Sequence, residues 1–274
     1  MTSRPNSRVN LDKAIERHFG SYGKSTEARS IMAAAIVGQM LKLGVVKGGC
    51  SLKLRYGMHR TRATMDLDTA CKGDLFDFIG DLSARLKAGW CGFTGEIVRR
   101  NPATPRNVPA QYVMKPYSVR LMYGGQSWCT VPLEVGFNEI GDADEADFGL
   151  SPDVSGIFTT IGFPVPDSVP LMLSEHQVAQ KLHGLTEPGS RRVNDIVDLQ
   201  VIFEHSEIDL MKTRQICVRL FAFRRRQPWP PRVVKGLDWE SVYEASRSKT
   251  ELTKSLDEAI VWANDLIARI DAAK

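Results

Sequence analysis

Apolar side chains recur every three to four positions near the start of the chain, which is the period of a helix with one buried face. This spacing predicts helices over residues 11–19 and 26–43, with Gly44 as the stop signal of the second helix. A short apolar strand, residues 45–47, follows, and then a further helix over residues 51–56. The alternation of helix and strand favours a mixed α/β fold.

The middle of the chain changes to the alternating pattern that is typical of β-strands. Asp74 has the side chain of a helix N-cap and precedes an amphipathic segment. Gly124-Gly125 separates two alternating segments, which indicates a hairpin turn. The predicted elements are a strand over 65–71, a helix over 75–86, and strands over 117–123 and 128–137 within a strand-rich region, 93–137.

The last third of the chain returns to helical spacing. The predicted helices cover residues 174–185, 190–205, 209–225, 239–247 and 252–270. A stretch of acidic residues and prolines without a regular period, residues 138–170, precedes them. We therefore predict an α/β domain with a mixed sheet, residues 1–165, and an all-helical domain, residues 166–274.

Composition adds few constraints, since 43% hydrophobic and 25% charged residues are ordinary for a globular protein. The net charge of +4 permits an anionic partner such as RNA but does not require one. Five cysteines without a C-x-x-C pair are typical of reduced intracellular thiols. Residues 1–13 lack the apolar core of a signal peptide, and no apolar run is long enough for a bilayer. We expect a cytoplasmic protein with no membrane partner.

Two short motifs carry the candidate chemistry. Gly48 and Gly49 precede a predicted helix, where backbone N–H groups can approach a phosphate and Ser51 offers a hydroxyl. Asp66 and Asp68 alternate on a predicted strand, so their carboxylates share one face. Adjacent carboxylates repel unless a cation lies between them, and Mg²⁺ binds such oxygens together with substrate phosphates. Either motif alone fits a plain turn or a surface strand, whereas both in this order indicate nucleotide transfer.

Two further residues extend this site. Glu134 lies between Leu133 and Val135 on a predicted strand, so it occupies the face opposite to their apolar side chains. It is either a third metal-binding carboxylate that deprotonates the attacking hydroxyl or a solvent-facing glutamate. Arg62, four residues before Asp66, either clamps a triphosphate through its planar guanidinium or balances the charge of the acids.

The helical part contains charged residues whose roles the pattern leaves open. Lys181 lies off an apolar helical stripe and is either solvated or directed into a cleft between the two parts. Asp195 and Asp198 share one helix face, which is either exposed or paired with neighbouring arginines. The arginine run 224–226 and Trp229 combine charge with a stacking ring, as an RNA contact requires. A helix end that carries cations is the alternative.

In their order along the chain, these motifs resemble the AbiEii/AbiGii toxin family, which includes the MenT toxins. The resemblance extends from Lys47 to Leu199. It implies a polymerase-β-like nucleotidyltransferase core followed by helices that complete the active-site cleft. Members are toxins of bacterial toxin–antitoxin or abortive-infection modules and use Mg²⁺ and a nucleoside triphosphate. The MenT members add nucleotides to the 3′ end of tRNA and thereby block translation.

The resemblance also assigns roles to residues. The implied catalytic residues are Asp66, Asp68, Glu134, Lys181 and Asp198, and the implied metal ligands are Asp66, Asp68 and Glu134. The implied nucleotide-binding residues are Gly48, Gly49, Ser51, Arg62, Lys181 and Asp195. Glu134 stands where many members have aspartate, and Thr64 stands where many have serine.

We expect the partners to be a nucleoside triphosphate, the acceptor end of tRNA and an antitoxin protein, with neither a membrane nor DNA. We expect Glu134 or Asp198 to be the base or a metal ligand, and the sequence does not separate these roles. Transfer to a protein or small-molecule hydroxyl is one alternative, and a non-catalytic binding protein is another. Phosphorylation of Thr64 would place negative charge beside the carboxylate pair and block nucleotide binding.

Overall fold

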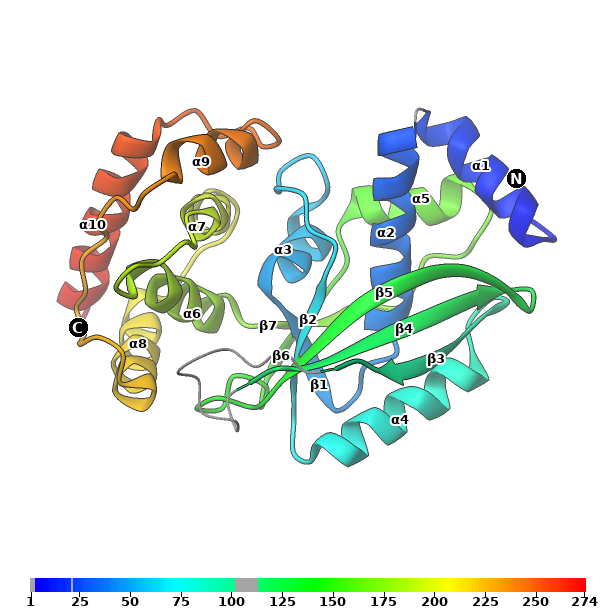
Figure 1. Ribbon diagram of the computed structural model, residues 1–274, viewed down its shortest axis with the longest axis horizontal. Helices are drawn as coiled ribbons and strands as arrows, with labels where there is room; N and C mark the ends of the chain where they lie inside the picture. Colours follow the sequence, from blue (N-terminus) through cyan, green and yellow to red (C-terminus); the bar gives the residue numbers. More distant parts are fainter. Residues whose placement is uncertain (1–2, 21, 102–112) are drawn as a thin grey trace. The chain divides into compact units, whose positions relative to one another are not determined.

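The computed structural model describes residues 3–20, 22–101 and 113–274 (Figure 1). The chain forms two compact units. The first comprises Met1–Gly57, Thr64–Asn138 and Ala143–Leu171, and the second comprises Met58–Ala63, Glu139–Asp142 and Met172–Lys274. The sequence placed the division after residue 165, whereas these units divide at Leu171. Two short segments that precede this point also belong to the second unit.

The first unit is built on a mixed sheet, which has seven strands over the described ranges. The strands are β1 Gly44–Lys47, β2 Leu67–Cys71, β3 Phe93–Arg99, β4 Lys115–Tyr123, β5 Gln126–Gly136, β6 Ala146–Gly149 and β7 Val169–Met172. Their order is β3-β4-β5-β2-β1-β7-β6. β2 is parallel to β5, and β1 is parallel to β7, whereas β1–β2, β3–β4 and β4–β5 are antiparallel. The predicted α/β class with a mixed sheet is confirmed.

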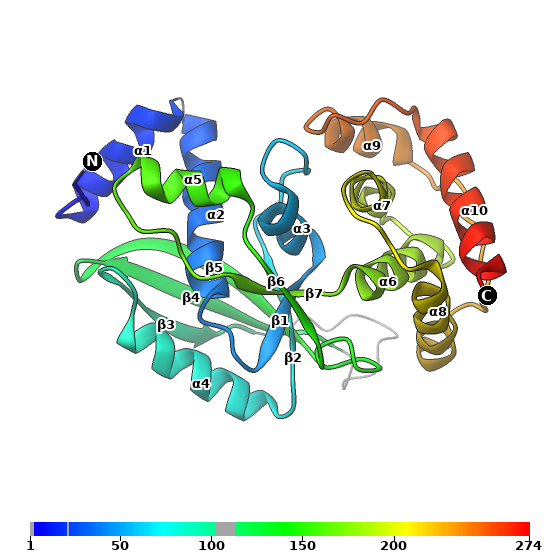
Figure 2. The same ribbon diagram turned by 180° about the vertical axis from the view of Figure 1, so that it is seen from behind.

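Helices cover both faces of this sheet. They are α1 Arg8–Phe19, α2 Tyr22–Gly38, α3 Gly48–Tyr56, α4 Leu75–Ala88 and α5 Pro152–Thr160. Figures 1 and 2 show α4 along one face, where it packs on β3, and α2 with α5 along the other, where α2 packs on β5. The unit is therefore a sheet between two layers of helices.

Two predictions were confirmed at positions where a single side chain or a glycine determines the local backbone conformation. The Asp74 carboxylate accepts hydrogen bonds from the N–H groups of Phe76 and Asp77 and caps α4, as predicted. Gly124 and Gly125 both have positive φ and connect β4 to β5, which confirms the hairpin.

Two predictions for the first unit were wrong. α2 ends at Gly38 rather than at Gly44, and Gly44 is instead the first residue of β1. A side chain at Gly44 would meet the carbonyl group of Ala70, so this glycine permits close strand pairing rather than a helix stop. Residues 138–170 were read as irregular, but β6, α5 and the start of β7 lie there. The strand-rich region 93–137 also includes residues 102–112, which lie outside the described residues.

The second unit is helical, as predicted. Its helices are α6 Ser174–Thr186, α7 Asn194–His205, α8 Leu210–Arg224, α9 Trp239–Arg247 and α10 Leu256–Ala272. α6 packs on α7 and α8, and α10 packs on α7, α8 and α9. Ser255 and Glu258 form a capping box at the start of α10, four residues later than the start predicted from periodicity alone. Among the described helices, none has the length and apolar character required to cross a bilayer.

The acidic segment after β5 has a structural explanation. Asp142 is buried, and its carboxylate accepts hydrogen bonds from the backbone N–H of Glu139 and from the Gln180 amide on α6. Asp144 accepts a hydrogen bond from Asn138, and Asp147 pairs with Arg55. These carboxylates are therefore used to hold the segment in place.

Replacement of Leu67 tests the placement of β2 in the core. Leu67 is fully buried beside its strand partner Leu133, so Leu67→Ala should lower the free energy of unfolding by about 2–5 kcal/mol. Met65 is 66% exposed, and Met65→Ala should change it by less than about 0.5 kcal/mol. Urea denaturation of both variants measures the difference, and equal values would contradict this assignment of faces.

Candidate functional site

The first part of the candidate site is the turn between β1 and α3. β1 ends at Lys47 and α3 begins at the next residue, Gly48, which has φ of +67°. A methyl group on Gly48 would lie 2.5 Å from Oδ2 of Asp68, so the carboxylate lies directly against the turn. The first backbone N–H groups of α3 have no acceptor within the helix and carry partial positive charge. The structure thus brings the predicted glycine turn and Asp68 together.

Strand register places three charged residues in one row. Asp68 on β2 is the partner of Glu134 on the parallel strand β5 and of Lys47 on the antiparallel strand β1. Partner residues on neighbouring strands project to the same face, so Glu134 lies beside Asp68 as the sequence anticipated. Lys47 received no role from the sequence. Its position just before Gly48-Gly49 was the available signal, because a strand residue next to an anion-binding turn is placed to neutralise that anion.

Asp66 and Ser51 lie in surroundings that differ from those predicted from the sequence. Asp66 is exposed and lies just before β2, which begins at Leu67. Asp66 was expected to lie on the same strand as Asp68. Ser51 lies in the first turn of α3 and is fully buried, so its hydroxyl has no surface toward solvent. Over the described residues, no group of three or more histidine, cysteine, aspartate or glutamate side chains has the arrangement of a metal site. The strand register pairs Asp68 with Glu134, whereas Asp66 lies outside β2, two residues before Asp68.

Cys50 lies next to this turn but does not have the properties of a nucleophile. Burial, with the nearby charges of Asp68 and Asp66, raises the pKa of the Cys50 thiol to about 12, although Lys53 acts in the opposite direction. The neutral thiol is therefore the form present at neutral pH, and a thiol reacts poorly compared with a thiolate. Cys50 is therefore not a candidate nucleophile.

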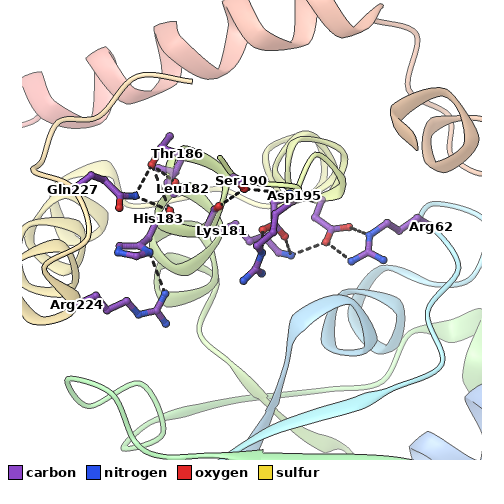
Figure 3. A network of polar contacts seen from close by, with 12 residues as sticks. Arg62, Lys181, Leu182, His183, Thr186, Ser190, Asp195, Arg224 and Gln227 are labelled. Atoms are coloured by element: carbon purple, nitrogen blue, oxygen red, sulfur yellow. Dashed lines mark hydrogen bonds and ion pairs between the residues drawn. The ribbon is translucent and has the colours of Figure 1, made fainter. Parts of the chain in front are cut away.

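The second part of the candidate site is a network of buried charges within the second unit (Figure 3). Nζ of Lys181 on α6 lies 2.6 Å from Oδ2 of Asp198 and 3.1 Å from Oδ1 of Asp195, both on α7. Arg62 donates to both carboxylate oxygens of Asp198, at 2.9 and 3.0 Å. Nε of Arg192 lies 2.7 Å from Oδ2 of Asp195. The sequence predicted each of these residues except Arg192 as a site residue.

Burial decides between the alternatives that the sequence left open here. Lys181, Asp195 and Asp198 are each at most 4% exposed, so the alternatives of a solvated lysine and an exposed acidic face are wrong. Burial alone raises the pKa of Asp198, but the charges of Lys181 and Arg62 outweigh burial, and the pKa lies below its ordinary value. Asp198 is therefore a firmly ionised, fully engaged carboxylate, which makes it a weak proton acceptor.

His183 lies two residues beyond Lys181 on α6 and is also buried. Its ring packs edge to face on Phe221, with 4.8 Å between ring centroids, and Nη1 of Arg224 lies 3.4 Å from Nδ1 of His183. Because arginine only donates, Nδ1 accepts and the ring is neutral. Burial, then the charges of Arg224, Arg192 and Arg226, lower the pKa of His183 to about 3. This buried, neutral environment is that of a structural histidine.

Comparison with solved structures shows which fold the chain has. MenT4, a nucleotidyltransferase toxin from Mycobacterium tuberculosis H37Rv, aligns with a TM-score of 0.54 and 16% identity, over 95% of this chain and 99% of that chain. A putative nucleotidyltransferase from H. pylori aligns with a TM-score of 0.47 and 16% identity, over 90% of this chain and 94% of that chain. The alignment with MenT4 shows that this chain has the same fold as that toxin.

The particular family follows from the sequence match. The model of the family described as nucleotidyl transferase AbiEii toxin, type IV toxin–antitoxin system, matches residues 30–266, and the chain belongs to this family. The predicted resemblance is thus confirmed. No curated protein sequence matches the chain.

The contact between Gly48 and Asp68 is testable by a pair of glycine variants. Gly48→Ala and Gly73→Ala both place an alanine at positive φ, which costs about 1–2 kcal/mol, but a side chain at Gly73 meets no atom within 4 Å. Gly48→Ala should therefore lower the free energy of unfolding more than Gly73→Ala does. Adding Asp68→Ala to Gly48→Ala should recover part of that excess. A double-mutant cycle in urea measures the coupling, and additive losses would contradict the contact.

The environment of His183 predicts a specific pH dependence of stability. The unfolded chain takes up a proton near pH 6.5, whereas the folded protein does so only near pH 3. The contribution of His183 to the free energy of unfolding is therefore fully present above pH 6.5. It is lost as pH falls below that value, by at most about 1.4 kcal/mol for each pH unit. Between pH 7 and 5, His183→Gln should reduce the slope of unfolding free energy against pH.

Proposed function

We propose that this protein is the toxin of a bacterial toxin–antitoxin system and transfers nucleotides from a nucleoside triphosphate to the 3′ end of tRNA. The modified tRNA could not be charged, so translation would stop until an antitoxin restrains the protein. The observation that carries the proposal is the position of Asp68, which lies against the Gly48 turn and beside Glu134. A phosphate-binding helix start and adjacent carboxylates are what transfer from a triphosphate requires.

The donor set fits Mg²⁺, since carboxylate oxygens are its preferred protein ligands. Asp68 and Glu134 would hold the ion, with Asp66 joining from the exposed segment before β2. When bound, Mg²⁺ would neutralise triphosphate charge and polarise the α-phosphate. Lys47, the third residue of the row, would add positive charge beside the same phosphates.

The residues of the first unit support a direct transfer. The backbone N–H groups of Gly48 and Gly49 would bind the β- and γ-phosphates, and Ser51 would stabilise the turn from its buried position. The acceptor hydroxyl attacks the α-phosphorus in line, the bond to the bridging oxygen breaks, and pyrophosphate leaves. The hydroxyl proton passes to Glu134. We prefer Glu134 to Asp198 as the base because Asp198 is fully engaged by Lys181 and Arg62.

The charged network of the second unit belongs to the proposal as a nucleotide-binding group. Arg62 and Lys181 would contact the triphosphate, with Asp195 and Asp198 holding the two cations in position. A phosphate approaching Arg62 or Lys181 would compete with carboxylates that these cations already contact. The network therefore fixes the cations before substrate binds, which lowers the cost of ordering them.

Transfer to a protein or small-molecule hydroxyl is the first alternative, and a non-catalytic partner-binding protein is the second. The net charge of +4 is compatible with RNA, and activity on RNA should fall with rising salt as phosphate contacts are displaced. The presence of both paired carboxylates argues against a purely binding role, since that role has no need of them. Phosphorylation of Thr64, a half-buried residue two positions before Asp66, remains a proposal for control.

The decisive test is incubation of the protein with Mg²⁺, total bacterial tRNA and each α-labelled nucleoside triphosphate. Wild-type protein should move label onto tRNA, and Asp68→Ala should abolish transfer because it removes a metal ligand. Glu134→Gln should lower kcat by about 10²–10⁴-fold through loss of the base. Glu96→Gln is the matched control, because Glu96 is an exposed glutamate on β3 of the same sheet, paired with Arg120.

Circular dichroism should show that each variant keeps its fold. Full transfer by a folded Asp68→Ala protein would refute the metal assignment. Label on protein or on a small molecule, with none on RNA, would overturn the proposed acceptor. Absence of label from a folded sample that binds nucleotide would favour the non-catalytic alternative.

A further inference from the structure

A cavity of about 530 Å³ lies in the second unit, where α8 ends and the chain continues through a proline-containing segment. It is distinct from the buried charge network of Lys181. The residues that line it are Val218, Phe221, Ala222, Arg225, Arg226, Gln227, Pro228 and Trp229. None of these described lining residues is acidic, so the charge of the lining favours an anionic ligand.

The aromatic part of the lining is held in a fixed orientation. Nε1 of Trp229 donates to Oδ1 of Asp271 on α10 at 2.8 Å. The Trp229 ring packs edge to face on Phe221, with 5.3 Å between centroids. Phe221 is buried, whereas Trp229 is half-buried. A tryptophan that is anchored through its edge and lines a cavity is suited to stacking against a nucleobase.

The cationic part of the lining has one arginine that differs from its neighbours. Arg224 pairs with Glu139, and Arg226 pairs with Glu187 at 3.1 Å. Arg225 is exposed, and among the described residues its side chain has no hydrogen-bond or ion-pair partner. It occupies the left-handed C-cap of α8, with φ of +55°, a conformation that glycine adopts more easily. The guanidinium of Arg225 thus stands at the cavity with its charge available.

The cavity is connected to the helix that carries the candidate nucleotide-binding lysine. Gln227 donates to the carbonyl oxygen of His183 at 2.8 Å and to the hydroxyl of Thr186 at 3.1 Å (Figure 3). Both acceptors lie on α6, which also contains Lys181. The segment that forms the cavity wall is therefore fixed to α6 rather than loosely attached.

We propose that this cavity binds a nucleotide of single-stranded RNA, with the base against Trp229 and a phosphate against Arg225. The proposal rests on the proposed function, because it supplies a second contact for the RNA acceptor. Stacking on an aromatic ring tolerates any base, and an arginine contact to the backbone reads no sequence. The cavity would thus provide affinity for RNA without selecting a sequence. The C-terminal end of α8 carries partial negative charge, which repels a phosphate at the cavity. The positive charges of residues 224–226 offset this repulsion.

The test uses two variants of Ala222, an exposed lining residue on α8. Ala222→Glu places a negative charge at the cavity, and Ala222→Gln has nearly the same size without the charge. Affinity for a short fluorescein-labelled single-stranded RNA is measured by fluorescence anisotropy at several salt concentrations, without nucleotide. Ala222→Glu should bind about tenfold more weakly than Ala222→Gln, as expected when one phosphate contact is opposed.

Arg225→Gly is the second variant. Glycine relieves the positive φ at this position, so the fold should be retained or slightly stabilised. RNA affinity should fall, and the slope of log K against log salt should become less steep by about 0.7, the value for one contact to a single strand. Equal RNA affinity and equal slopes for wild type and both charge variants would overturn the proposal.

A parallel titration with a fluorescent ATP analogue separates RNA from free nucleotide. Loss of ATP affinity with unchanged RNA binding in the Ala222→Glu and Arg225→Gly variants would overturn the RNA assignment. These measurements need no turnover. Variant-sensitive RNA binding by a protein that labels no tRNA would support the cavity while refuting transfer to tRNA, so the two proposals fail separately.

Discussion

Asp68 can lie against the turn between β1 and α3 only because residue 48 has no side chain. The register of the sheet then places Glu134 and Lys47 beside Asp68, so backbone hydrogen bonds alone bring three charged residues to the start of α3. A shift of one residue in β2 would exchange Asp68 for the fully buried Leu67. Burial of Leu67 in the apolar core therefore stabilises this register. The register in turn keeps Asp68, Glu134 and Lys47 in one row.

The second unit contains fully charged side chains that are buried. Two carboxylates and one ammonium are almost completely buried in the contact between α6 and α7, and guanidinium groups complete their hydrogen bonds. Such groups contribute little to net stability, since their desolvation cost offsets their attraction. They do require one geometry, because loss of any partner leaves an uncompensated buried charge. This explains how Lys181 and Asp198 are held in one arrangement, whatever ligand they contact.

Prediction from the sequence succeeded where the signal was local. The Asp74 cap and the Gly124-Gly125 turn depend on neighbouring residues and were correct. α5 was missed because residues 138–170 show no helical period among their acidic residues and prolines, although Pro152 at the start of the helix favours helix formation. β7 was missed because its partner, β1, lies far away in the sequence and is parallel to it. A short strand that contains proline has little local pattern to identify it.

The sequence by itself determined the class of fold, the glycine turn and the order of the charged motifs, because side-chain type and periodicity act over a few residues. Only the tertiary structure decided which charges meet. Arg62 contacts Asp198 across 136 positions, and Lys47 joins the row of Asp68 through strand pairing. Burial, protonation and ion pairing depend on what packs around a group, and periodicity reports only the face on which that group lies.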